Sequence, residues 1–324
     1  RSVFNLGSDI SVFPSVRNIY GAIIVFSFTL YPYVYLVSRS AFLNQSKPMK
    51  ESARLLGLSE VGVFFKLALP IIRPAAIGGL MLVIMETISD FGAVDHFAIQ
   101  TFTTGIFRTW YGMYDLQTAM QLASLLLIIV GIFFILERNS RDRAAFTAND
   151  SSFVPEDGIR LSKIKSSFLF LICFIPIFIG FILPITELTL WAFESKSSFF
   201  SQKFIQTSFN SISLAITAGL ITAILAVIIN FSIRFKPSSF IQRLSSLLSV
   251  GYAVPGLILA VGMVQLLIYL DNNVLNSVDV VLTGSLFGLL LAYIIKTYAL
   301  ANSSVESGYE RITSSLDDSS KLLG

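Results

Sequence analysis

Long apolar runs separated by charged segments are the dominant pattern along the chain. A membrane-spanning helix needs about 20 apolar residues, because it rises 1.5 Å per residue through roughly 30 Å of hydrocarbon. Two runs are apolar except for a few charges, namely Glu86, Asp90 and Asp95 in one and Lys296 in the other. With five uncharged runs they predict seven spans, at 18–38, 74–95, 116–136, 166–186 (extendable to 193), 204–233, 244–270 and 280–300.

The basic residues predict how these spans are oriented. Segments between spans carry Lys and Arg unevenly: alternate segments, which include 39–73 and 137–165, hold 18 of the 23 basic residues. Lys and Arg concentrate on the cytoplasmic side of membrane proteins. We therefore expect the chain to start outside and to end in the cytoplasm of a bacterial inner membrane.

Composition supports a membrane protein and excludes several other classes. Of 324 residues, 54% are hydrophobic and only 13% are charged, with mean hydropathy +0.75, whereas a soluble chain carries about 25% charge. The net charge of +3 is too small to indicate a nucleic-acid partner. A single Cys and a single His exclude a disulfide framework and His-based metal clusters within the chain. No firm metal site follows from the sequence.

An internal repeat is the strongest sequence observation. Residues 51–57 read ESARLLG, and residues 318–324 read DSSKLLG, at an offset of 267. Tyr31 and Tyr298 are related by the same offset. Both motif copies follow a span that is predicted to run inward, so the repeats are parallel.

The repeat predicts how the chain is divided. We interpret 1–136 as the C-terminal part of a first permease half, 137–165 as a cytoplasmic linker, and 166–324 as the N-terminal part of a second half. The linker is the longest polar stretch and has no apolar period. We expect the chain to be an internal part of a protein of roughly 500 residues with two similar halves.

The first motif copy, 51–70, resembles the EAA loop of bacterial ABC importer permeases. Its usual pattern is E-A-A, a glycine, and later I-x-L-P. The matching residues are Glu51, Ala53, Gly57, Leu67, Leu69 and Pro70. The resemblance implies a loop that couples the permease to an ATPase. We expect the second copy, which starts at Asp318 and includes Ser320 and Gly324, to be the beginning of an equivalent loop that is truncated in this sequence.

The residues of the loop suit that role physically. Gly57 can adopt backbone angles that break a helix. Apolar residues Leu58, Val61, Phe64 and Phe65 then lie on one face of a second short helix. We expect this face to dock in a groove of the ATPase, with Pro70 ending the helix before the next span. The alternative is an interfacial helix that lies flat on the membrane.

The segment after the loop narrows the resemblance. Residues 86–115 combine ET-x-x-DFG, TFTTGI and W-x-GM-x-D, and 252–262 and 292–306 read YAVPGLILAVG and AYIIKTYALANSSVE. These motifs resemble the ferric-iron permeases of bacterial ABC importers. That family implies an all-α polytopic type I ABC importer fold (MetI-like) with two tandem repeats. It also implies a periplasmic iron-binding protein and a cytoplasmic ATPase dimer that holds Mg-ATP. This chain itself would bind no cofactor. Related fused permeases import thiamine or phosphonates, and those substrates stay open.

Two acids within the second span are candidates for the translocation path. Glu86 and Asp90 lie four residues apart, on one face of a helix that runs through 95. A carboxylate in hydrocarbon is costly, so each should face protein or water, and carboxylates are ligands for hard cations. The alternative is that Asp90 caps or pairs locally near the outer interface.

Two other functions remain open on the sequence alone. An ion-coupled secondary transporter is one, although such proteins are often built from inverted rather than parallel repeats. An intramembrane enzyme is the other, but no catalytic triad or metalloprotease spacing is present. The chain also lacks a phosphate-binding loop motif. We therefore expect a transport subunit rather than an enzyme, with ATP hydrolysed on a partner.

Overall fold

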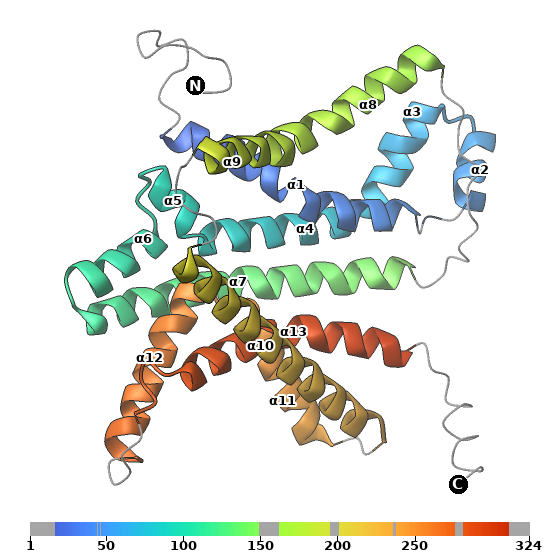
Figure 1. Ribbon diagram of the computed structural model, residues 1–324. Coiled ribbons are helices and arrows are strands. Elements are labelled where there is room, and N and C mark those ends of the chain that lie inside the picture. The colour runs from blue at the N-terminus through green and yellow to red at the C-terminus, as the bar shows by residue number, and fades with distance from the viewer. Residues whose placement is uncertain are drawn as a thin grey trace. The chain divides into compact units, whose positions relative to one another are not determined.

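A computed structural model describes residues 17–43, 45, 47–148, 162–194, 201–235, 238–275 and 281–310. Within these ranges the regular structure is entirely helical (Figure 1). The elements are α1 (Ile19–Leu43), α2 (Lys47–Leu55), α3 (Glu60–Val63), η1 (Phe64–Ala68), α4 (Leu69–Ser89), α5 (Gly92–His96), α6 (Phe102–Phe107), η2 (Arg108–Gly112), α7 (Leu116–Ala148), α8 (Lys163–Ile177), η3 (Phe178–Ile182), α9 (Leu183–Glu194), α10 (Gln202–Phe235), α11 (Ser239–Val250), α12 (Gly256–Asn273) and α13 (Leu286–Glu310). The three η elements are π-helical turns.

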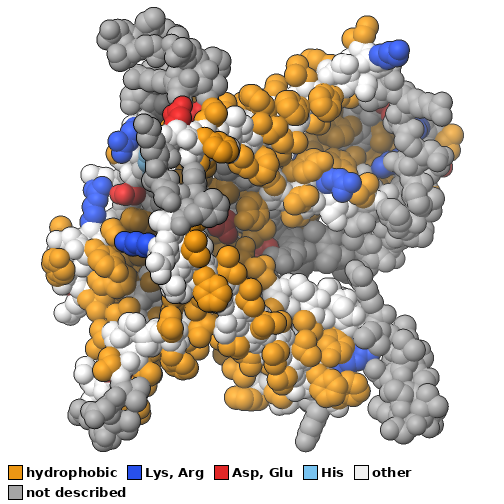
Figure 2. Space-filling model, in the orientation of Figure 1, with side chains coloured by type: hydrophobic (Ala, Val, Ile, Leu, Met, Phe, Trp, Pro, Cys, Tyr) orange, Lys and Arg blue, Asp and Glu red, His pale blue; other side chains and the backbone are white. Residues whose placement is uncertain are grey.

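Seven helices in the described ranges are long and apolar enough to cross a membrane, which confirms the predicted number. They are Ile19–Leu43, Glu60–Ser89, Leu116–Glu137, Lys163–Glu194, Gln202–Phe235, Gly256–Asn273 and Leu286–Tyr309. Hydrophobic side chains cover most of the described surface on the face drawn in Figure 2. Such a surface suits lipid, where a helix satisfies its backbone groups internally. The chain is therefore a multi-pass membrane protein.

The second span begins earlier than predicted, because Pro70 does not end the helix. Proline normally clashes with the carbonyl four residues before it. Here the π-helical turn η1 widens the helix, and the Leu69 N–H donates to the carbonyl of Phe64, five residues back. The helix therefore runs from Glu60 to Ser89 without a break. η3 precedes Pro184 in the same way.

The predicted span 244–270 is wrong, because the helix breaks within it. α11 ends at Val250 and α12 starts at Gly256, with a non-helical segment between them. Pro255 is the N-cap of α12 in an extended conformation (ψ 137°). A proline has no N–H to donate to the preceding turn, so a helix readily stops before it. Only α12 is long enough to be a span.

The predicted linker starts as a helix. α7 continues past the apolar run to Ala148, and α8 starts at Lys163. Residues 138–148 are rich in Arg and Ala, which favour helices. The absence of a period in apolar positions therefore did not predict that the helix continues to Ala148.

The described residues form two compact units. The first comprises 1–105 and 128–196, and the second comprises 106–127 and 197–324. In the first unit α1 packs against α4, and a Cβ placed on Gly79 would lie 2.9 Å from the Cα of Val34. Small residues permit this close approach of membrane helices. Gly180 of η3 likewise approaches the backbone of Phe28 on α1.

Polar side chains join three helices of the second unit. The Oδ1 of Asn302 on α13 accepts from Asn230 Nδ2 on α10 at 2.8 Å. It also accepts from the hydroxyls of Tyr298 and Ser245, at 3.2 and 3.3 Å. Interhelical hydrogen bonds of this kind stabilise helix association in membranes. They fix α10, α11 and α13 against one another.

The helices α1 and α13 occupy equivalent positions in the sequence repeat. Each has 25 residues, and both their first and their last residues differ by 267. Each also has the same kind of cap: the Gly21 N–H donates to Asn18, and the Gly288 N–H donates to Ser285. The repeat offset found in the sequence therefore relates two helices of equal length and similar start. The domain boundaries themselves remain a prediction.

Candidate functional site

The loop between α1 and α4 contains a sharp turn at Gly57. Gly57 has φ +84°, in the left-handed region that favours glycine. The Gly57 N–H donates to the Arg54 carbonyl at 2.9 Å, and the Leu58 N–H donates to the Ala53 carbonyl at 3.2 Å. This pair of bonds is the Schellman ending of a helix. The prediction that Gly57 breaks the helix is confirmed.

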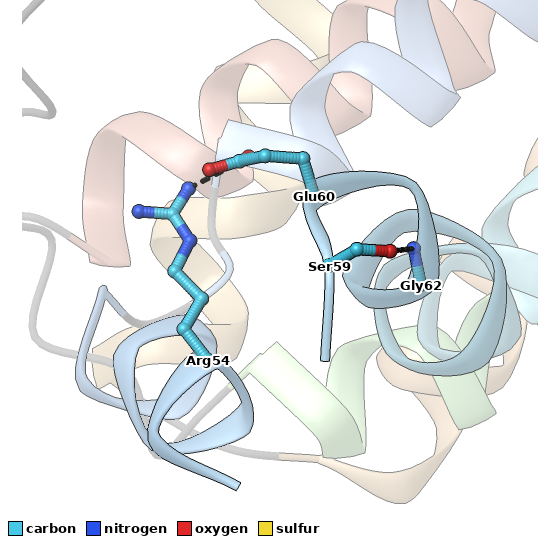
Figure 3. A network of polar contacts seen from close by, with 4 residues as sticks. All are labelled: Arg54, Ser59, Glu60 and Gly62. Carbon is cyan, nitrogen blue, oxygen red and sulfur yellow. Dashed lines mark hydrogen bonds and ion pairs between the residues drawn. The ribbon is translucent and has the colours of Figure 1, made fainter. Parts of the chain in front are cut away.

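Polar contacts fix the angle between α2 and α3 (Figure 3). Arg54 Nη2 lies 2.9 Å from Glu60 Oε2 across the turn. Ser59 caps α3, because its hydroxyl accepts from the Gly62 N–H at 3.2 Å. An exposed ion pair contributes about 0–1 kcal/mol, and an N-cap contributes about 1 kcal/mol. The turn is thus held by its own sequence.

Four apolar side chains of this loop are strongly exposed. We call them the apolar loop surface: Leu55 (89% exposed), Leu56 (85%), Val61 (65%) and Phe65 (59%). The apolar period of the second helix indicated Val61 and Phe65. It missed the two leucines, which belong to the end of α2 and to the turn. The sequence signal that could have indicated their exposure is that two leucines stand next to each other directly before Gly57.

Phe64 is placed differently from Phe65. Its ring stacks on that of Phe42 in α1, with centroids 6.0 Å apart and planes 14° apart. It also meets the ring of Phe65 edge-on, at 5.0 Å. Phe64 therefore ties the loop to α1, and Phe65 is the more exposed member of the pair.

The other matched motif residues divide between the protein interior and the surface. Ala53 is buried, whereas Leu69 and Pro70 are half-buried at the start of α4. Glu51 is exposed on α2. Gln45, which the sequence did not indicate, donates from Nε2 to the Ala68 carbonyl at 2.9 Å. The loop is therefore anchored at its small and aliphatic positions.

The second loop cannot be compared with the first. Asp318, Ser320 and Gly324 lie outside the described residues. Their proposed role stays a prediction from the sequence.

The two candidate acids of the translocation path do not share a helix face. α4 ends at Ser89, and Asp90 has an extended backbone (φ −70°, ψ 135°). Its Oδ1 accepts from the N–H of Ala93 at 2.8 Å and of Val94 at 3.3 Å, which caps α5. Its carbonyl accepts from the Thr103 hydroxyl at 2.6 Å. These contacts favour the structural alternative for Asp90.

Glu86 is half-buried on the last turns of α4. It lies within electrostatic range of Tyr33 on α1, the helix against which α4 packs. Within the described residues, no group of three or more His, Cys, Asp or Glu side chains could hold a metal ion.

A carboxylate also marks the start of α7. Asp115 accepts from the Thr118 hydroxyl at 2.5 Å and from the Thr118 N–H at 2.9 Å. The side-chain hydrogen bond from Thr118 is the main cause that lowers the pKa of Asp115. This cap lies beside Tyr114, whose φ of +56° closes the turn before α7.

The amino-acid sequence is similar to those of known membrane transport proteins. Residues 10–136 match the family model described as "Binding-protein-dependent transport system inner membrane component". The chain is 24% identical over 318 residues to the "Fe(3+)-transport system permease protein FbpB 2" of Haemophilus influenzae, covering 95% of this chain and 60% of that protein. It therefore spans less than two thirds of that relative's length.

A second relative matches a shorter segment. The "Molybdate/tungstate transport system permease protein WtpB" of Pyrococcus abyssi is 28% identical over 118 residues, which is 36% of this chain and 48% of that protein. No solved structure matches the chain. Residues 10–136 thus resemble that family of transport components, and the chain is similar to a transport permease along most of its length and has seven candidate spans in its described residues.

Proposed function

We propose that this chain is part of the permease of an ABC importer that moves ferric iron across a bacterial inner membrane. A periplasmic iron-binding protein would deliver the substrate, and a cytoplasmic ATPase dimer would hydrolyse Mg-ATP. Segments 39–73 and 137–165 would face the cytoplasm, because they carry 12 of the 23 basic residues. The first described span, α1, would then run inward from an external N-terminal side.

The observation that carries the proposal is the apolar loop surface on a rigid turn. Large apolar side chains at 59–89% exposure are costly in water unless a partner covers them. Burying one such side chain contributes about 1.5–3 kcal/mol. The Schellman turn, the Ser59 cap and the Arg54–Glu60 pair hold this surface in one shape. A preformed apolar helix face suits docking in a groove.

The continuous helix offers a route for coupling. Val61 and Phe65 lie near the start of a 30-residue helix, and Glu86 lies near its end. At 1.5 Å per residue this rod is about 45 Å long. A displacement of the loop by the ATPase would therefore move Glu86 with it. Packing of Gly79 against Val34 would carry α1 along.

Ferric iron is the favoured substrate among the alternatives. The relative named for Fe(3+) matches 95% of the chain, whereas the molybdate/tungstate relative matches 36%. Glu86 offers a hard oxygen ligand, which suits a hard cation. Molybdate, thiamine and phosphonates are the alternative substrates, and an uptake assay separates them directly.

The test is co-purification of the ATPase with variants of the full-length permease, with ATP turnover and uptake measured together. Phe65→Ala and Gly57→Val should reduce ATPase binding or uncouple hydrolysis from uptake, and Glu51→Gln tests the acid of the motif. Asp318→Asn and Gly324→Val test the second loop, where we expect a similar but unequal effect.

A comparison variant is Phe64→Ala, because Phe64 stacks on Phe42 of α1 and is less exposed (42%) than Phe65 (59%). It should affect the stability of the permease more than its binding of the ATPase. Normal ATPase binding and normal transport by the variants of both loops would refute the coupling role. In that case an interfacial helix lying on the membrane would explain the exposed apolar residues.

A further inference from the structure

The break between α11 and α12 packs directly against the middle of α13. A Cβ placed on Gly251 would lie 2.5 Å from the carbonyl oxygen of Ile295. Gly251 therefore allows the end of α11 to touch the backbone of α13. The next residue of α13 is Lys296, whose side chain reaches the same non-helical segment.

Lys296 binds the carbonyls of the broken helix. Its Nζ donates to the carbonyl of Tyr252 at 2.8 Å and to that of Val254 at 2.8 Å. The same atom lies 5.5 Å from the centre of the Tyr252 ring. Both carbonyls lie within the three residues before Pro255, at which the regular hydrogen-bond ladder stops. Two carbonyl oxygens and an aromatic face make a small cation site.

The position of Lys296 explains why this site is needed. Lys296 is the eleventh residue of the 25-residue α13, so it lies about 15 Å along the helix, near the middle of a bilayer of roughly 30 Å. A charge is costly there unless it finds partners. Carbonyls released by a helix break are also costly unless they find donors. The ammonium of Lys296 donates the hydrogen bonds that the two carbonyls need, and the carbonyls are the acceptors that the ammonium needs. Lys296 therefore does not extend to the lipid headgroups, as its place near the end of an apolar run would predict.

Among the described residues, the position on α1 that is equivalent to Lys296 makes a different contact. The repeat offset relates Lys296 to Thr29 on α1. Thr29 instead donates its hydroxyl to the Val25 carbonyl of its own helix, at 2.8 Å. The two halves of the permease therefore differ at the centre of otherwise equivalent helices.

We propose that Lys296 is a positioning residue whose ammonium occupies a two-carbonyl cation site and clamps the break between α11 and α12 to α13. In transporters with broken helices, such carbonyls often hold a free coupling ion. Here the chain supplies the cation itself, so α12 and α13 move as one unit and need no inorganic ion at this point. This inference depends on neither the substrate nor the ATPase contact.

Chemical rescue in the full-length permease, purified with its ATPase, tests the clamp. Lys296→Ala removes three methylene groups and the ammonium, which propylammonium chloride replaces; n-propanol is the neutral match. Hydrogen exchange of the 252–259 amides should be at least tenfold faster in Lys296→Ala and Lys296→Met than in wild type. Propylammonium should restore slow exchange in Lys296→Ala, and n-propanol should not. The control variant Lys203→Ala removes an exposed lysine of α10. It should exchange its 252–259 amides at the wild-type rate, both with and without propylammonium.

The outcomes separate the clamp from a general loss of folding. If Lys296→Ala can be purified only in propylammonium, and not in n-propanol, the result supports the clamp. Wild-type exchange in Lys296→Met would overturn it. Faster exchange that propylammonium leaves unchanged would also overturn it. Exchange is measured without uptake, so a failed iron assay does not affect this test.

Discussion

Gly57 offers the sharpest test of the loop, because its substitution changes one physical quantity. Its φ is +84°, and no heavy atom lies within 4 Å of a Cβ built there. An added side chain therefore meets open space, and only the backbone conformation is penalised. The left-handed region costs a residue with a Cβ about 1–2 kcal/mol. We therefore expect Gly57→Ala to destabilise the turn by about 1–2 kcal/mol.

This cost translates into binding. If the ATPase recognises only the turn shown here, its apparent affinity falls with the population of that turn. A cost of 1–2 kcal/mol corresponds to at most about 5- to 30-fold weaker binding. Gly57→Asn should lie close to wild type, because asparagine tolerates this region. Gly57→Val should be the most damaging, because β-branched residues are outliers at positive φ.

The assay is titration of the detergent-solubilised permease with purified ATPase, followed by uptake at saturating ATPase. Gly131→Ala is the matched control, since Gly131 lies within α7 with equally open space and an ordinary helical backbone. It should bind ATPase normally. The order Asn, Ala, Val in increasing loss is the expected result. Equal binding by all three variants would refute the reasoning, because the turn would then be irrelevant to docking.

Three further predictions follow from other parts of the chain. Glu86→Gln should lower uptake at least tenfold while assembly with the ATPase survives; wild-type uptake would move Glu86 to a structural role. A Cys introduced at Ser152 should resist a membrane-impermeant thiol reagent in intact cells, and rapid labelling from outside would reverse the topology. The cap by Asp115 stabilises α7 while its carboxylate is charged: it should be fully present above the ordinary pKa of 3.8 and be lost as pH falls through the lowered pKa. The protection of the Thr118 amide from exchange, relative to its intrinsic rate at each pH, measures this, and Asp115→Asn should show at neutral pH the low protection that wild type shows at low pH.

The sequence predicted the spans well because hydrocarbon thickness sets a length that composition reveals. It failed where a local device overrides the general rule. Pro70 predicts the end of a helix, yet the π-helical turn η1 allows the helix to continue past this proline. The apolar run 244–270 reads as one span, but Pro255 and the ammonium of Lys296 make a stable break inside it. Hydropathy cannot reveal that the ammonium of Lys296 donates hydrogen bonds to carbonyls of the segment between α11 and α12.

The structure of the loop between α1 and α4 was predictable in part. The Gly57 turn and the exposure of Phe65 followed from residue type and period. The stacking of Phe64 on Phe42 did not, because it depends on how α1 ends beside α3. Asp90 illustrates the same limit: four-residue spacing predicts a shared face with Glu86 only if the helix continues, and α4 ends one residue too early.

Uptake into proteoliposomes tests the central claim most directly. The full-length permease, its ATPase and the periplasmic binding protein would be reconstituted, with radioactive ferric iron supplied outside and ATP enclosed within. The account predicts iron accumulation that requires ATP and both partners and that falls sharply with Phe65→Ala. Iron uptake driven by an ion gradient without ATP, or transport unaffected by omission of the ATPase, would contradict it.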